Sequence, residues 1–170
     1  PLERPRPVGR VVAQLAEQLG KGAFLYLSGI IPLPSEYAFM ELSAVSRELP
    51  ADAGERVVLA LDCANERRLG PDSSFVERSP LVVDIDHHHD NTRFGSINHV
   101  DPQSSCTAEM VWDLMRGLGV ESTQAIADAL YVGLVTDTGR FMYENTGPRA
   151  HEMAADLIAR GVDVHAIYRR

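Results

Sequence analysis

Apolar residues recur every three or four positions in four stretches of the chain, which is the spacing of amphipathic helices. These stretches are residues 11–19, 106–118, 124–134 and 146–161. Gly20 follows the first stretch as a helix stop, and Pro148 stands in the first turn of the fourth. Ser122 or Thr123 can cap the third. The pattern therefore predicts four helices.

Two shorter stretches, at residues 23–27 and 57–61, are continuously apolar, and a third, at residues 81–85, is apolar except for Asp84. Continuous runs of this length are typical of parallel strands that are covered on both faces. Pro32 and Pro34 predict a loop after the first strand, while Asp62 and Asp86 end the other two. The alternation of strands and helices predicts an α/β fold, a parallel sheet with helices on both faces. Such sheets bind ligands outside the carboxyl ends of their strands.

Composition limits the classes of function. The chain has 170 residues, enough for one domain, and a net charge of −8, so general attraction to nucleic acid or anionic membrane is not expected. A polyanionic substrate would need local positive charge from metal ions or a few arginines. The sequence has no apolar run of about 20 residues, so no membrane partner is expected. Two cysteines without CxxC spacing predict free thiols and a cytoplasmic protein.

The strongest chemical signal is DIDHHHDN at residues 84–91, which holds three histidines and three aspartates at the end of a predicted buried strand. One interpretation is a solvated polar loop that happens to be rich in histidine. The other is a cation site, because imidazole and carboxylate ligands satisfy the ring nitrogens and the charges together. We favour the cation site.

Two further aspartates lie near the ends of predicted elements. Asp62 follows the second strand, and Asp137 stands between threonines before Gly139. Each alone is explained by a structural role, because aspartate often caps a turn or a helix. Their joint arrival at the carboxyl ends of successive α/β elements favours one shared site.

These residues resemble the motifs of the DHH phosphoesterase superfamily. The second motif of that family is similar to LDCA at residues 61–64, the third to DHH at 86–88, and the fourth to TDTGRF at 136–141. SSCTAE at 104–109 resembles the helix opening that follows the DHH loop. Together with YAF at 37–39, the run of residues 83–141 looks closest to the branch of bacterial oligoribonucleases and 3′-phosphoadenosine 5′-phosphate phosphatases.

The resemblance implies roles for individual residues. Asp62, His87 and Asp137 would be metal ligands. His88 would face the phosphate or donate a proton, and Asp86 would orient a histidine. The cofactor implied is Mn²⁺, with two ions in the complete enzyme. The activity implied is two-metal hydrolysis of short oligoribonucleotides or adenosine 3′,5′-bisphosphate, so the expected partner is a short RNA or a nucleotide.

The chain departs from the family pattern at both ends. The first motif should hold a histidine and two aspartates, but residues 3–9 contain neither type. We expect the catalytic domain to span residues 1–165 and an interdomain linker to start at 166–170, without the C-terminal substrate domain of the family. The chain as given is therefore expected to lack a complete two-metal site.

Two alternatives remain open at this point. One is a non-catalytic DHH-fold module that binds nucleotides or assembles with other proteins. The other is a single-metal site, such as a Zn²⁺ site, built on the histidine cluster. The sequence does not fix the preferred substrate or the oligomeric state, and it is compatible with a homodimer. His99, a short turn after the DHH motif, is predicted to lie in a loop.

Overall fold

The structure is a computed structural model that describes residues 7–29, 45–71 and 73–169. Its strands are β1 (Leu25–Tyr26), β2 (Val45–Ser46), β3 (Val58–Leu61), β4 (Val82–Asp86) and β5 (Ile97–Val100). Its α-helices are α1 (Val8–Gln18), α2 (Ser74–Arg78), α3 (Thr107–Gly117), α4 (Gln124–Asp137), α5 (Pro148–Ala159) and α6 (Val164–Tyr168). Two short 3₁₀-helices, η3 (Ala53–Glu55) and η4 (Glu66–Leu69), flank β3.

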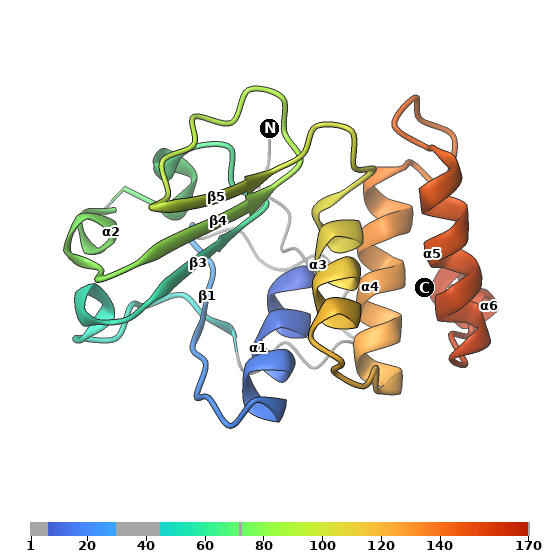
Figure 1. Cartoon of the computed structure of the whole chain (residues 1–170), viewed down its shortest axis with the longest axis horizontal. Coiled ribbons are helices and arrows are strands. Elements are labelled where there is room, and N and C mark those ends of the chain that lie inside the picture. Colours follow the sequence, from blue (N-terminus) through green and yellow to red (C-terminus); the bar gives the residue numbers. More distant parts are fainter. Residues whose placement is uncertain (1–6, 30–44, 72, 170) are drawn as a thin grey trace.

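The strands form two parallel sheets, one of β1 and β2 and one in the order β3-β4-β5. In the larger sheet, Leu61 pairs with Ile85, so β3 and β4 end side by side. The helices lie beside these sheets, with α1, α3, α4 and α5 gathered on one side (Figure 1). The predicted fold class is confirmed, since parallel sheets are flanked by helices. Within the described ranges, the first predicted strand is reduced to β1 and pairs with β2.

Helix α4 lies at the centre of the helical layer, in contact with α1, α3 and α5 (Figure 1). Nine of its residues are buried, so it has no polar stripe of the kind found on a surface helix. It approaches α3 closely at Gly133, where an added Cβ would lie 2.9 Å from Ala108 Cβ. This close packing fixes the carboxyl end of α4 relative to the amino end of α3.

All four predicted helices are present, with ends that differ by one to three residues from the predicted stretches, apart from the start of α4. Helix α4 runs three residues further, so that Asp137 is its last residue, and Thr123 caps its start by accepting a hydrogen bond from Ile126 N. The expected linker from residue 166 overlaps α6, where Ile167 packs against the core. This helix was not predicted because five residues give too short an apolar pattern.

One local prediction is wrong. His99 lies in strand β5, paired with Ile85, and not in a loop. Strand β5 is half exposed and contains Asn98 and His99, so it lacks the continuous apolar run by which β3 and β4 were found. The predicted loop at Pro32 and Pro34 lies outside the described residues. None of the helices in the described ranges is long and apolar enough to cross a bilayer.

Candidate metal centre

The site begins at the turn that follows β3. Asp62 adopts a left-handed backbone conformation, with φ of +61°, although it is not glycine. Such a residue is uncommon, because the Cβ atom of an L-residue crowds the backbone there. The Asp62 N–H donates to Ile85 O at 2.9 Å, so this turn remains tied to β4.

The Asp62 carboxylate lies next to two imidazole rings at the edge of the sheet. Its Oδ1 is 3.5 Å from His87 Nε2 and 3.6 Å from His88 Nδ1, and it accepts a hydrogen bond from Thr107 Oγ1 at 2.8 Å. One donor atom from each of Asp62, His87 and His88 lies within 4.8 Å of the others. Two imidazoles and one carboxylate, without a thiolate, form a donor set that suits divalent transition metals. Asp62 and His87 are therefore suited to bind a metal ion, and the His88 ring lies next to them.

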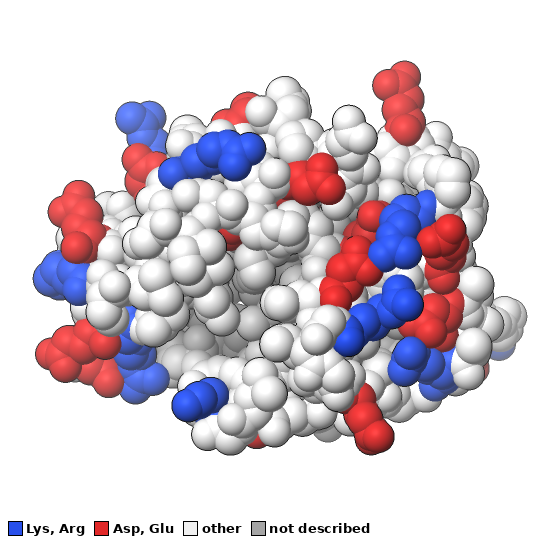
Figure 2. All heavy atoms as spheres, viewed as in Figure 1, with Lys and Arg blue, Asp and Glu red and all other residues white. Residues whose placement is uncertain are grey.

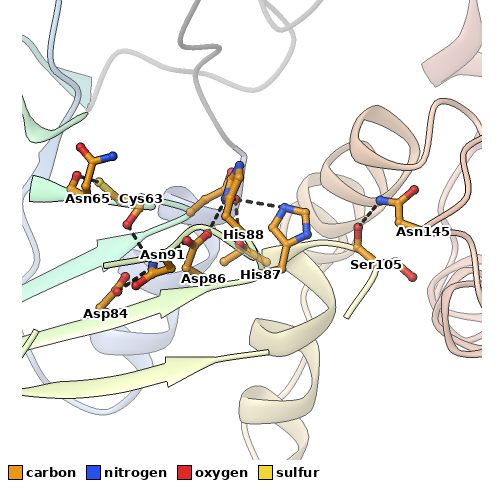
Figure 3. A network of polar contacts seen from close by, with 11 residues as sticks. Cys63, Asn65, Asp84, Asp86, His87, His88, Asn91, Ser105 and Asn145 are labelled. Carbon is orange, nitrogen blue, oxygen red and sulfur yellow. Dashed lines mark hydrogen bonds and ion pairs between the residues drawn. The ribbon is translucent and has the colours of Figure 1, made fainter. Parts of the chain in front are cut away.

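Below the imidazoles lies a chain of partly buried hydrogen bonds. His88 Nδ1 is 2.7 Å from Asp86 Oδ1, and Asn91 Nδ2 donates to Asp86 Oδ2 at 2.7 Å and to Asp84 Oδ2 at 2.9 Å. Asp84 and Asp86 are both fully buried. Figure 3 shows Asn91 between the two carboxylates, with His88 on the other side of Asp86. Side chains within residues 84–91 thus hold the DHH loop in place by hydrogen bonds to one another.

The two buried carboxyls have opposite pKa shifts. Burial raises the pKa of Asp84 to about 6, since the hydrogen bond from Asn91 only partly offsets the loss of water. Burial also acts to raise the pKa of Asp86, but hydrogen bonds from His88 and Asn91 outweigh it and lower that pKa to about 2. Asp86 is therefore an anion at neutral pH, when it can stabilise a protonated His88 ring.

The two cysteines are free, as predicted, and both are buried. Burial raises the pKa of the Cys63 thiol to about 12, and the nearby Asp84 charge adds to this shift. Burial likewise raises the pKa of Cys106, with a contribution from the Asp137 charge. Neither thiol is a nucleophile at neutral pH.

Comparison with known proteins agrees with this geometry. The model of the "DHH family, N-terminal domain" matches residues 8–134. The chain belongs to the DHH family.

Among its relatives, the bifunctional oligoribonuclease and PAP phosphatase NrnA of Thermus thermophilus is 41% identical over 122 residues, which cover 72% of this chain and 36% of the relative. The protein of the same name from Bacillus subtilis is 30% identical over 130 residues, covering 75% of this chain and 40% of the relative. The chain thus spans two fifths or less of the length of these relatives. Within the DHH family, it belongs to the NrnA branch.

Two solved structures share the fold. An exopolyphosphatase-related protein from Bacteroides fragilis superimposes with a TM-score of 0.83 at 23% identity, over 97% of this chain and 52% of that chain. A putative family II inorganic pyrophosphatase from Methanococcus jannaschii superimposes with a TM-score of 0.69 at 19% identity, over 96% of this chain and 55% of the other. At these identities the likeness concerns the fold.

The DHH motifs do not all meet in one cluster. Asp62 and His87 come together, and His88 joins them, whereas Asp137 is not part of this group of mutually close donors in the described part of the chain. Asp137 lies at the carboxyl end of α4, and its carbonyl accepts a hydrogen bond from Asn145 Nδ2 at 3.1 Å. The same amide donates to Ser105 O at 2.7 Å, just before α3 (Figure 3). Asn145 therefore ties the Asp137 end of α4 to the start of the helix that carries Thr107.

The turn after Asp137 is held by its own backbone. Thr138 is fully buried, donates from Oγ1 to Leu134 O at 2.7 Å and accepts from Phe141 N at 3.1 Å. Gly139, Arg140 and Phe141 then have φ values of +56°, +61° and +67°. Glycine adopts this conformation without penalty, but it is costly for Arg140 and Phe141, and such strained residues cluster at functional sites.

Sequence reasoning missed two residues that position the site. Thr107 donates to Asp62 from 45 positions away, and Asn145 reaches Ser105 across 40 positions. No periodic pattern links residues so far apart. Thr107 lies in the SSCTAE segment that resembles the family, and this was the one available signal.

The region expected to hold the first DHH motif begins helix α1 instead. Pro7 precedes α1, and Val8 and Gly9 form its first turn. Residues 3–6 lie outside the described part of the chain. No histidine or aspartate occurs among residues 3–9, as the sequence shows.

Proposed function

We propose that this protein is a metal-dependent phosphoesterase that hydrolyses short oligoribonucleotides or adenosine 3′,5′-bisphosphate. The observation that carries the proposal is the position of Asp62 Oδ1, within 3.6 Å of ring nitrogens of both His87 and His88. The two relatives named NrnA support the choice of substrates, since each name joins oligoribonuclease with PAP phosphatase.

In this proposal Asp62, His87 and Asp137 are ligands of Mn²⁺, with two ions in the complete enzyme. When bound, the ions lower the pKa of a water molecule and neutralise charge on the phosphate. Asp137 would join the centre from the helix side, through the end of α4 that Asn145 ties to Ser105. Asp62 is well suited to its role, because Thr107 already orients the carboxylate by donating to Oδ1.

His88 is the proposed proton donor to the leaving oxygen. Its Nδ1 faces Asp86 Oδ1 at 2.7 Å, which leaves Nε2 to exchange a proton with the substrate. Asp86, whose pKa is lowered to about 2, stays anionic and stabilises the imidazolium form of His88. The pair thus combines a fixed ring orientation with a proton at Nε2 when the ring is in its imidazolium form.

Surface charge supports a local source of phosphate affinity. The chain has a net charge of −8. On the face drawn in Figure 2, blue and red side chains are interspersed. Arg149, for example, forms ion pairs with Asp113 and Glu152. A phosphate would therefore be attracted by metal ions at the site more than by the general field of the protein. A cytoplasmic location is part of the proposal and fits two free, buried thiols.

The test uses the full-length protein loaded with Mn²⁺ and follows release of mononucleotide or phosphate from a short RNA and from adenosine 3′,5′-bisphosphate. His87→Ala should lose metal and activity together. His88→Ala should keep its metal and slow turnover by about 10²–10⁴-fold, the usual contribution of a general acid. His89 is exposed, so His89→Ala is the matched control and should change neither.

Two outcomes would overturn the proposal or its register. If the metal-loaded protein hydrolyses neither substrate, nor pyrophosphate or polyphosphate, the domain is a non-catalytic binding or assembly module. If His89→Ala proves as damaging as His88→Ala, the roles of the histidines are assigned one position too early.

A further inference from the structure

The Asn91 side chain occupies an unusual position beneath the DHH loop. Its Nδ2 lies 2.7 Å from Asp86 Oδ2, 2.9 Å from Asp84 Oδ2 and 3.3 Å from Cys63 O. An amide NH₂ has two hydrogens, so the two short contacts to carboxylate oxygens take them. One neutral side chain thus separates two buried carboxyls.

The orientation of the Asn91 amide is fixed independently of those carboxyls. Its Oδ1 accepts a hydrogen bond from Arg93 N at 2.6 Å, and a backbone N–H can only donate. The oxygen therefore faces Arg93, and the NH₂ group faces Asp84 and Asp86. A flipped amide would lose its hydrogen bonds with Arg93 N, Asp84 and Asp86, so the arrangement has one stable orientation.

This arrangement restricts His88 through Asp86. Asn91 binds Oδ2 of Asp86, and His88 Nδ1 faces Oδ1, so both oxygens of one fully buried carboxylate are engaged. The carboxylate cannot rotate without losing a hydrogen bond. A carboxylate accepts and does not donate, so the neutral His88 ring must carry its proton on Nδ1 and have an unprotonated Nε2.

Asp84 holds the other side of the Asn91 amide. It is fully buried, and its Oδ2 accepts from Asn91, while Oδ1 has no hydrogen-bond partner in the described part of the chain. Its neighbour on β5, Asn98, does not help, since that amide bonds to the backbone of Gly95. A buried carboxyl with a single partner is costly to fold. We therefore interpret the role of Asp84 as holding the Asn91 amide in place.

We propose that Asn91 is a positioning residue, held by Asp84, which fixes Asp86 and through it the tautomer of His88. The inference rests on the proposed function, since His88 acts on phosphate only in that case. It goes further in assigning Asp84 and Asn91 to the device that presents His88 Nε2 to the substrate.

The first test reads the tautomer directly, in metal-free full-length protein. Nitrogen-15 NMR of the histidine rings, at about pH 9 where imidazole is neutral, should show His88 protonated on Nδ1. In Asn91→Leu, which has similar size but no donor, a major fraction of His88 should shift to protonation on Nε2. Asp84→Asn keeps an acceptor for Asn91 and should retain the wild-type tautomer, whereas Asp84→Leu should behave as Asn91→Leu does.

Asn98→Leu is the matched control, because it removes a partly buried amide from the adjacent strand without changing the contacts of Asp86 or His88. It should lower the melting temperature but leave the His88 spectrum unchanged. If Asn91→Leu does not fold, Asn91→Ser is used, since a serine hydroxyl can donate to only one of the two carboxyls. A folded Asn91 variant with an unchanged His88 tautomer would overturn the proposal.

The second test concerns kinetics. With Mn²⁺ bound, Asn91→Leu should lower kcat by about 10–100-fold, as for other residues that orient a catalytic side chain, and leave KM and Mn²⁺ affinity within about threefold. A rise in KM with unchanged kcat would contradict a positioning role. A protein inactive on every phosphate ester would refute the proposed function, while the NMR result would still decide whether Asn91 sets the tautomer.

Discussion

The two flanks of the candidate centre are built in different ways. On the strand flank, formed by the ends of β3 and β4, side chains are positioned by hydrogen bonds from other side chains: Thr107 donates to Asp62, and Asn91 donates to Asp86. On the helix flank, formed by residues 136–141 at the end of α4, the contacts of Thr138 go to backbone groups. Charged groups thus gather on the strand flank, while the helix flank supplies a shaped backbone next to a single carboxylate.

The difference shows where each flank is vulnerable. A side-chain network changes its electrostatics when one member is replaced, because the remaining buried groups lose partners. A backbone turn with three left-handed residues instead depends on the local conformation and on buried capping groups. Substitutions on the strand flank should therefore change metal binding and chemistry, and those on the helix flank should mainly change stability, except at Asp137.

The largest expected effect tests whether both flanks belong to one metal centre. Asp62→Asn and Asp137→Asn each remove an anionic ligand, so each should lower Mn²⁺ affinity by more than the roughly 10–100-fold typical of residues that only orient ligands. Calorimetric titration of Mn²⁺ measures this. Asp128→Asn, in the same helix α4 but bonded to Gln124, is the control and should bind as the wild type does. Unchanged binding by Asp137→Asn would exclude the helix flank from the centre.

Two buried threonines, one on each flank, provide a matched pair. Thr107→Val and Thr138→Val each delete one buried hydroxyl at nearly constant volume, and each should lower the free energy of unfolding by about 1–3 kcal/mol. Only Thr107→Val should also weaken Mn²⁺ binding, since Thr107 orients the Asp62 carboxylate. Denaturant unfolding and metal titration of both variants test the comparison. Equal losses of metal affinity would show that the helix flank acts on the metal as directly as the strand flank.

The same division explains what the sequence could predict. The strand flank was recognisable because buried strands are continuously apolar and their ends carry clustered Asp and His. The α/β class and the positions of Asp62 and His87 followed from that pattern. Thr107 and Asn145 were missed because their contacts join residues 45 and 40 positions apart. The left-handed turn at Arg140 and Phe141 was also missed, since neither residue type favours that conformation.

Stability should depend on pH through the two carboxyls of the strand flank. The pKa of Asp84 is raised to about 6, so the folded state binds an extra proton between about pH 4 and 6, and stability falls as pH rises through this window. The pKa of Asp86 is lowered to about 2, so its contribution is present above about pH 4 and is lost as pH falls towards 2.

Asp84→Asn should therefore remove the loss between about pH 4 and 6 and leave the acid limb below pH 4 in place. Relative to the wild type, the variant should gain on the order of 1–3 kcal/mol at pH 7 compared with pH 4. Urea unfolding across this pH range, without metal, measures the difference. A variant whose stability falls between pH 4 and 6 as steeply as that of the wild type would show that another group titrates there.

The smallest effect tests whether the C-terminal helix α6 contributes to the helix flank. Tyr168 of α6 lies beside Arg140, whose guanidinium carbon is 5.3 Å from the centre of its ring, and it also hydrogen-bonds Tyr131 of α4. Tyr168→Phe removes the second contact alone, and because the ring is partly exposed, water can replace the hydroxyl. The expected loss of stability is about 0.5–1 kcal/mol. Tyr168→Leu also removes the cation–π contact, which adds about 0.5–1 kcal/mol at an exposed site.

If the backbone alone shapes the helix flank, both variants should bind Mn²⁺ as tightly as the wild type, and thermal melts should show the full effect. A loss of Mn²⁺ affinity in Tyr168→Leu but not in Tyr168→Phe would mean that Arg140 needs its aromatic neighbour to keep the turn after Asp137 in place. In that case side chains would hold the helix flank as well.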